Sequence, residues 1–546
     1  MYKTLITGMK ALAVILGCAT QCFGVDGWES VRAAAVTRIR PIIYDTDGDD
    51  MLLYPDDKTA TVENFTALRL RHVLGTKAKT VSYCPECSGF CHMTTRKAGE
   101  AMTNSIPTIP GTRNAMMEFA ALNTDALEMA SDFCRTNGLE LFVSFRVNDM
   151  HDAETRPDKP SPFLPRFKMD HPEFMMGSVD GVRNMDLFSG CGWSCVDFSH
   201  RAVREHMKEC VRKLVENYAV DGIEYDFNRH GVLFRSVATG GVASDGELES
   251  FTCLMRDLKD ITEAAGRRRN RPIVIAVRTP DSEGYARAIG IDLKRWFEEK
   301  LVDVWIGAGY FQLNHWNDSV AFAHKHGIVF YASLDESRIE RHAKVNGLPF
   351  IPGRMTRAHY AARYAAAMAS GCDGVYLFNL EGAMLHEMAS MDPRDVSCEE
   401  KFYFAADRGS GGYLPNMWLK DGERFNNMPR IDPGGCCFDS PSRALRPRVL
   451  KPGETCRFRI CLGDDFAGAV PPRRVTATVL CGLKEGGRVA LSANGRDFAA
   501  SVGKNGMAVI LLPSDFLRKC LNDIAVTFPE STSATTFNDF MISVTP

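Results

Sequence analysis

The chain lacks any marked excess of charge. Its 546 residues include 65 lysines and arginines against 68 aspartates and glutamates, a formal net charge of −3. Because positive and negative side chains are nearly equal in number, there is no electrostatic reason to expect nucleic acid or an anionic membrane as a partner. The sequence also has no Walker-type phosphate loop and no Rossmann glycine fingerprint. We therefore predict no nucleic-acid partner, no nucleotide cofactor and no other cofactor.

The N-terminus has too short an apolar run to span a membrane. Residues 1–24, MYKTLITGMKALAVILGCATQCFG, place two lysines before the run ALAVILG and small residues after it. This layout is typical of a secretory signal peptide. We expect cleavage near Gly24 and export to the periplasm, cell surface or medium of a bacterium. The stretch VILGC also resembles a loose lipobox, which would make Cys18 a lipid anchor.

Cysteines are numerous, and several lie close together in the sequence. Two of the 18 fall in the signal region, which leaves 16 in the exported part. In an exported protein such cysteines are expected to form some disulfides and some buried free thiols. The stretch CPECSGFCH (84–92) is an alternative zinc knuckle, but no partner pair stands at the spacing of a zinc finger. No metal site is predicted.

Most of the chain alternates between β-branched apolar runs and amphipathic helical patterns. In residues 200–218, HRAVREHMKECVRKLVENY, apolar residues recur at three- and four-residue steps, as on a helix that faces a sheet. Eight strands separated by helices or long loops predict a (β/α)8 TIM barrel over residues 25–395. The expected strands are 38–45, 79–84, 139–147, 221–227, 272–278, 302–310, 327–334 and 373–380.

After the barrel the pattern changes. Residues 396–442 are rich in Gly, Pro, Asn and Asp, which is typical of a connecting segment. Residues 443–546 contain short alternating strands such as TCRFRICL and RRVTATVLCG, separated by turn residues. This part is predicted to be a small C-terminal β-sandwich that packs on the barrel or binds sugar.

The fourth expected strand carries two carboxylates on one face. In DGIEYDFNRH (221–230), side chains two residues apart share a face, so Glu224 and Asp226 point together into the barrel. Paired carboxylates at a strand end suit general acid, base or nucleophile chemistry, especially glycosidic bond cleavage. The alternative is an ion pair between one of them and an inward arginine, Arg146 or Arg278.

Other strand ends add polar side chains at the same end of the barrel, where barrel active sites are built. Asp226 is the first catalytic candidate, as the general acid or, as the alternative, the nucleophile, with Glu224 as its partner or as a group that shifts its pKa. Asp335 or Glu336 at the seventh strand is the next choice for the second catalytic group. The candidate substrate-binding residues are Asp45, Arg146, Asn148, Asp149, His151, Arg278, Tyr310, Asn379 and Glu381.

Three stretches of the predicted barrel carry a family resemblance. FRVNDMHD, the HPEF of FKMDHPEFMMG and DGIEYDFNRH resemble the glycosyl-hydrolase-like family 10 proteins. DGIEYDFNRH is also similar to the D-G-x-D-x-D-x-E motif of chitinase-type barrels, but Asn228 stands where that motif has its general-acid glutamate. The resemblance implies a carbohydrate-active barrel and a carbohydrate substrate. It does not define the catalytic pair.

Three functions follow from these features. The first is an exported glycoside hydrolase that cleaves a polysaccharide or glycoconjugate by carboxylate chemistry. The second is a non-catalytic carbohydrate-binding protein on a barrel scaffold, which the replacement of the glutamate by Asn228 permits. The third is a metal-dependent hydrolase that uses Asp45, Asp47, Asp149 and His151, although these residues have no recognised metal spacing.

Overall fold

A computed structural model describes most of the chain after the predicted signal peptide. The predictions for residues 1–24, including lipidation of Cys18, lie outside the described residues. The described residues are 25–46, 48, 50–85, 92–93, 95–98, 100–101, 110–161, 163–178, 192–309, 311–378, 380–406, 415–429, 435–437, 440–445, 448–468 and 471–546.

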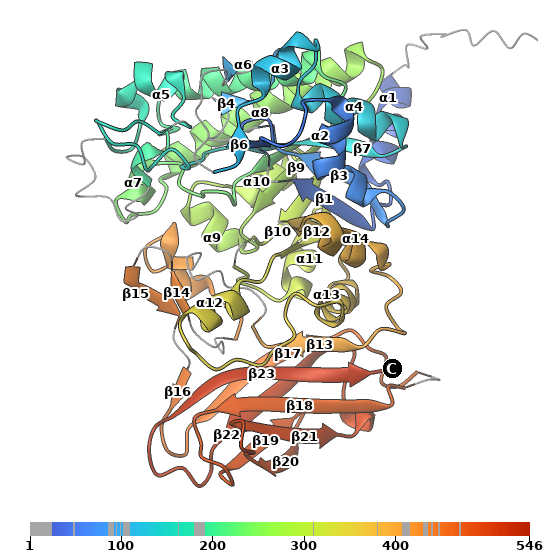
Figure 1. Cartoon of the computed structure of the whole chain (residues 1–546), viewed down its shortest axis with the longest axis vertical. Helices are drawn as coiled ribbons and strands as arrows, with labels where there is room; N and C mark the ends of the chain where they lie inside the picture. Colours follow the sequence, from blue (N-terminus) through green and yellow to red (C-terminus); the bar gives the residue numbers. More distant parts are fainter. Residues whose placement is uncertain are drawn as a thin grey trace, which may run out of the picture.

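Eight parallel strands close into a barrel, which confirms the predicted TIM barrel (Figure 1). Their order around the barrel is β1-β12-β11-β10-β9-β8-β7-β3, so each strand neighbours the next one along the chain. Every strand expected from the sequence coincides with one of them to within a few residues. The strands are β1 (Ile42–Thr46), β3 (Ala78–Tyr83), β7 (Glu140–Arg146), β8 (Gly222–Asp226), β9 (Val274–Thr279), β10 (Val304–Gly307), β11 (Val329–Asp335) and β12 (Gly374–Phe378).

Helices surround the barrel and bury their apolar faces on its outside. In α6, Val203, Met207 and Val211 are fully buried, as the three- and four-residue spacing predicts. Within the described residues, every helix is too short or too polar to cross a bilayer. The helices are α1 (Val25–Val36), α2 (Val62–Arg69), α3 (Met116–Ala121), α4 (Ala126–Thr136), α5 (Arg166–Asp170), α6 (Arg201–Asn217), α7 (Arg235–Ala238), α8 (Asp245–Arg268), α9 (Glu283–Ala288), α10 (Leu293–Glu298), α11 (Trp316–Lys325), α12 (Ile339–Val345), α13 (Arg357–Ala369) and α14 (Gly382–Ser390).

The barrel interior is apolar in the middle and charged at both ends. Near the amino-terminal ends of the strands, Arg40 Nε lies 2.7 Å from Glu140 Oε2, and both side chains are buried. Further along the barrel axis, towards the carboxyl ends of the strands, an apolar cluster fills the interior. It includes Phe142, Val274 and Ile306 from the barrel strands. This packed layer separates the Arg40–Glu140 ion pair from the polar groups at the carboxyl ends of the strands. The carboxyl ends of the strands are also the end at which barrel active sites are built.

The C-terminal part consists of two antiparallel sheets, which confirms the predicted β-sandwich. One sheet has the order β13-β23-β18-β21 with β16 beside β23, and the other the order β17-β22-β19-β20. β13 lies in the stretch expected to be a connecting segment, so that stretch contributes a strand to the sandwich. The strands are β13 (Lys401–Phe404), β16 (Arg448–Leu450), β17 (Thr455–Leu462), β18 (Arg474–Cys481), β19 (Arg488–Ala493), β20 (Arg496–Ser501), β21 (Met507–Leu512), β22 (Cys520–Thr527) and β23 (Thr535–Thr545).

The sandwich packs directly on the barrel, below it in Figure 1. Arg354, in the loop before α13, donates from both terminal nitrogens to Asp539 of β23, at 2.8 and 2.9 Å. Both side chains are fully buried, and the Arg354 guanidinium lies 3.9 Å from the centre of the Phe404 ring. A buried, doubly bonded ion pair of this kind fixes the geometry of the contact.

Shorter elements lie in the loops. Two-stranded pairs are formed by β2 (Tyr54–Pro55) with β6 (Thr112–Arg113), β4 (His92–Met93) with β5 (Glu100–Ala101), and β14 (Gly435–Cys437) with β15 (Ser440–Leu445). The stretch 415–429 packs on loops at the carboxyl end of the barrel. There, the Trp418 ring lies against Gly231 and Phe311. A side chain at position 231 would overlap that ring, so glycine is required there.

Candidate active site

Strand β8 points its two carboxylates into the barrel. Ile223 and Tyr225 pack in the core that includes the surrounding helices, while Glu224 bonds to side chains on other barrel strands. This is the arrangement that two-residue periodicity predicts. Asp226 ends the strand one layer above Glu224, at the mouth of the barrel. Both side chains are almost completely buried, with exposures of 0% for Glu224 and 3% for Asp226.

Glu224 is held by hydroxyl groups from three strands. Ser82 Oγ donates to Oε2 at 2.7 Å, Tyr376 OH donates to Oε1 at 2.8 Å, and Ser144 Oγ lies 3.4 Å from Oε1. Burial raises the pKa of Glu224 to about 7, and the nearby charge of Asp226 adds to the shift. Glu224 therefore exchanges a proton near neutral pH.

Asp226 and Asp335 share one buried arginine. Arg278, at the end of β9, places Nη1 3.3 Å from Asp226 Oδ2 and Nη2 2.7 Å from Asp335 Oδ2. Burial disfavours the charge on Arg278, but Asp335 and Asp226 raise its pKa well above the usual value. The guanidinium also lies 4.2 Å from the centre of the Phe378 ring. The ion pair considered as an alternative for Asp226 is thus present, and it brings the two carboxylates to one group.

The ends of β7 and β8 carry a second polar cluster centred on Asp149. Arg146 Nη1 lies 3.1 Å from Asp149 Oδ2, and the backbone N–H of His151 donates to Oδ1 at 2.7 Å. The His151 ring also contacts Oδ1 through Nδ1, at 2.5 Å. Burial would raise the pKa of Asp149, but His151, Arg146 and His230 hold it well below its usual range. Asp149 is therefore a fixed negative charge.

The two histidines of this cluster differ in environment. His230 is buried, and the N–H of Met150 donates to its Nδ1 at 3.2 Å. Burial lowers the pKa of His230 to about 4, so its ring is neutral at neutral pH. His151 is partly exposed, and its Nε2 lies 3.0 Å from Arg229 Nη2. His151 is therefore the member of this cluster that a molecule entering the mouth can reach.

Asp149, His151 and His230 also have the donor atoms of a metal site. One ligand atom from each lies within 4.8 Å of the others. Two arginines contact the same residues, however: Arg146 bonds to Asp149 Oδ2, and Arg229 bonds to His151 Nε2. Fixed positive charges at these distances oppose a divalent cation. The residues thus fit a hydrogen-bonded network better than a metal centre.

Asn148 acts on the loops rather than on the mouth. Its amide nitrogen donates to the backbone oxygens of Val196, at 2.9 Å, and Val232, at 2.7 Å. Its side-chain oxygen accepts from the N–H of Val196 at 3.1 Å. The side chain ties the long loop after β7 to the loop after β8, and its contact with substrate stays a prediction. The tie between the loops positions Asp149 and His230.

Three of the remaining predicted site residues lie at or just after the ends of β1, β11 and β12. Asp45 is buried at the end of β1 and contributes to the field that acts on Arg278. Glu336 is partly exposed and pairs with Arg338 at 3.2 Å, and Glu381 is exposed and pairs with Arg69. Tyr310 and Asn379 lie outside the described residues, as does Asp47.

Several residues of the site were not predicted from the sequence. Ser82 and Tyr376 hold Glu224, Phe378 stacks on Arg278, and Arg229 and His230 join the Asp149 cluster. Two-residue periodicity could have found the inward-facing Ser82, Tyr376 and Phe378. Arg229 and His230 follow β8 directly within DGIEYDFNRH. Their position next to Asp226 was the available signal.

Comparison with known proteins gives only distant similarity. No family model and no curated protein matches the chain. Solved structures with a related arrangement include the glycoside hydrolase domain of PgaB (BpsB) from Bordetella bronchiseptica, with 10% identity, a TM-score of 0.37 and coverage of 63% of this chain and 94% of that one. A glycoside hydrolase family 18 N-acetylglucosaminidase from Paenibacillus barengoltzii has 11% identity, a TM-score of 0.33 and coverage of 64% and 99%.

An isomalto-dextranase from Arthrobacter globiformis T6, complexed with panose, covers more of this chain. It has 11% identity and a TM-score of 0.34, and the match covers 94% of this chain and 98% of that one. Similarities this low identify neither a substrate nor a reaction. The resemblance to glycosyl-hydrolase-like family 10 stays a prediction.

Proposed function

We propose that the chain is an exported glycoside hydrolase that cleaves a polysaccharide or glycoconjugate at the mouth of its barrel. The observation that carries the proposal is the pair Asp226 and Asp335, two carboxylates at strand ends that bind the same buried guanidinium. Glycosidases use two carboxyl groups about 5 to 9.5 Å apart, on either side of the scissile bond. Two carboxylates bonded to the two ends of one guanidinium suit such a spacing.

The contacts suggest a role for each group. Asp226 accepts from Arg278 and from the N–H of Asn228, at 2.8 Å. That environment suits a nucleophile or base better than the general acid expected from the sequence. Asp335 is the second carboxylate, and Glu224 below them is the proton-exchanging group that changes the charge of the mouth. His151, the reachable side chain of the neighbouring cluster, is a candidate for contact with the sugar.

The test is a glycan-library activity screen of the wild-type protein beside Asp226→Asn and Asp335→Asn. We expect the wild type to hydrolyse at least one glycan and each variant to lose at least 100-fold in kcat, the usual scale for loss of an acid–base group. The matched control is Asp303→Asn. Asp303 pairs with Arg32 at 3.0 Å, just before β10 and at the opposite end of the barrel. This control should lower stability and leave kcat unchanged.

One observation favours the second candidate, a non-catalytic carbohydrate-binding protein. Arg278 occupies an oxygen of both carboxylates, which is also how a purely structural cluster would be neutralised. The same screen separates the two functions. Glycan binding by the wild type without hydrolysis across the panel would contradict the hydrolase and support the binding protein.

A further inference from the structure

Two cysteines of the sandwich meet where it contacts the barrel. Cys461, near the end of β17, and Cys520, the first residue of β22, have their sulfur atoms 3.7 Å apart. The two strands are antiparallel neighbours, and Cys461 lies opposite Leu521 in the register. Both cysteines are free thiols, and both residues are partly exposed.

The backbone at Cys520 brings the two sulfurs together. In a regular antiparallel pair, residues 520 and 521 would point to opposite faces, so Cys520 would face away from Cys461. Cys520 instead has a φ of 79°. This conformation is rare for a residue other than glycine, and such strain persists only where the surrounding structure enforces it. It turns the Cys520 side chain towards Cys461.

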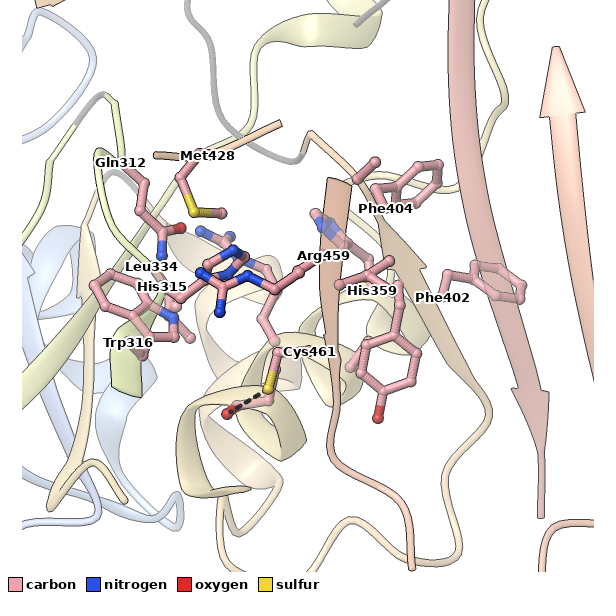
Figure 2. A pocket seen from close by; sticks show the side chains of 16 residues that line it. Gln312, His315, Trp316, Leu334, His359, Phe402, Phe404, Met428, Arg459 and Cys461 are labelled. Atoms are coloured by element: carbon pink, nitrogen blue, oxygen red, sulfur yellow. Dashed lines mark hydrogen bonds between the residues drawn. The ribbon is translucent and has the colours of Figure 1, made fainter. Parts of the chain in front are cut away.

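The barrel supplies polar partners for both sulfurs. The amide of Asn317, in α11, donates to Cys520 Sγ at 2.9 Å. The hydroxyl of Ser370, after α13, lies 3.5 Å from Cys461 Sγ and donates to Asn317 Oδ1 at 3.2 Å. Figure 2 shows Cys461 above α13, where its sulfur contacts the carbonyl oxygen of Ala366 at 3.6 Å. Residues of both parts of the protein thus hold one thiol pair.

The two thiols have opposite acid–base character. The hydrogen bond from Cys461, together with the one from Asn317, lowers the pKa of Cys520 to about 6. The same contact with Cys520, together with burial, raises the pKa of Cys461 well above its usual value. A thiolate is the nucleophile in disulfide exchange, and its neighbour then resolves the mixed disulfide.

We propose that Cys461 and Cys520 are a redox-active thiol pair that takes disulfides as substrate and closes into an intramolecular disulfide at the barrel–sandwich contact. The Cys520 thiolate attacks an external disulfide, RSSR, and forms Cys520–S–SR while one RS⁻ leaves. The Cys461 thiol loses its proton to solvent, and its sulfur attacks Cys520 Sγ and expels the second RS⁻. The protein loses two electrons and RSSR gains them. The sulfurs must close from 3.7 Å to about 2.05 Å.

The test uses the full chain and oxidised glutathione as the disulfide. The reduced protein is incubated with the probe under anaerobic conditions, quenched with an alkylating agent, digested and analysed by mass spectrometry. We expect a linked Cys461–Cys520 peptide from the wild type and a stable glutathione adduct on Cys520 in Cys461→Ser. In Cys520→Ser, Cys461 should remain reduced. The control Cys253→Ser, which removes an exposed cysteine on α8 of the barrel, should link as the wild type does.

A second measurement does not depend on the disulfide. The rate of Cys520 alkylation against pH should have a midpoint near 6, and Asn317→Ala should move that midpoint towards the ordinary thiol value of about 8.5. The wild-type protein would overturn the proposal if it gave no linked peptide. So would a Cys520 midpoint that stays at the ordinary value in the wild type.

Discussion

Nη2 of Arg278 lies 2.7 Å from Oδ2 of Asp335, and both side chains are almost fully buried at the mouth of the barrel. The other terminal nitrogen of Arg278 contacts Asp226. A single positive charge thus compensates two carboxylates from different strands. Arg278 is therefore the residue whose loss would leave both carboxylates without this shared partner.

Replacing Arg278 by methionine should destabilise the protein strongly. The change leaves two buried carboxylates without their common partner, and breaking a buried ion pair in this way typically costs about 3 to 5 kcal/mol. Urea unfolding at pH 7 measures the free energy of unfolding. The control is Arg38→Met, because Arg38 is exposed and its pair with Glu140 should contribute at most about 1 kcal/mol. Equal losses in the two variants would contradict the prediction.

Glu224 should make the stability of the protein depend on pH. Its pKa is 4.5 in the unfolded chain and about 7 in the folded one, so the folded state holds the extra proton between these values. Stability should therefore fall as pH rises from about 4.5 to about 7, by up to about 3 kcal/mol, and change no further above that range.

The variant Glu224→Gln removes this titration. The free energy of unfolding of the variant minus that of the wild type should be larger at pH 8 than at pH 5. Urea unfolding of both proteins at the two pH values measures it. A difference that is the same at both pH values would show that Glu224 does not titrate in this range.

Metal removal should leave the protein unchanged. Arg146 and Arg229 place fixed positive charges on Asp149 and His151, two of the three residues that a metal ion would need. We expect dialysis against EDTA to alter neither the melting temperature nor hydrolysis, and added Zn²⁺ not to raise the melting temperature. Activity that is lost with EDTA and restored by Zn²⁺ would instead establish the metal-dependent hydrolase considered from the sequence.

The Arg354–Asp539 pair should couple the barrel to the sandwich. Arg354→Met leaves Asp539 buried without its cation, at a cost of about 3 to 5 kcal/mol. Because the pair joins the two parts, we also expect their unfolding to separate into two transitions in scanning calorimetry. The control is Arg496→Met, which breaks an exposed pair with Asp515 inside the sandwich. One unchanged transition in Arg354→Met would argue against coupling through this pair.

Strand positions were predictable because each barrel strand is a short apolar run between turn residues. The edge strand β20, RDFAAS, was not predicted, since most of its side chains are exposed and its pattern resembles a loop. β13, KFYF, was missed because it follows a Pro- and Asp-rich stretch and pairs with a strand far along the chain. Local periodicity does not encode such long-range pairing.

Within the site, the direction in which side chains point was predictable from the sequence, but their bonding partners were not. Two-residue spacing placed Glu224 and Asp226 inside the barrel, as the hydrogen bonds of Glu224 to Ser82 and Tyr376 show. The shared role of Arg278 depends on the relative heights of β8, β9 and β11, which barrel closure sets. Asn148 shows the same limit, because only the folded loops reveal that backbone groups occupy its amide.

The pairing of β23 has a consequence for the order in which the chain can fold. β23 joins β13, β16 and β18 into one sheet, yet it follows all of them in the chain. Among the described strands, β13 pairs with β23 alone, so β13 stays unpaired until this last strand has docked. A chain whose barrel forms first therefore carries an unpaired strand edge beside the barrel until that step. Such an edge is a site for chaperone binding or for misassembly between neighbouring chains.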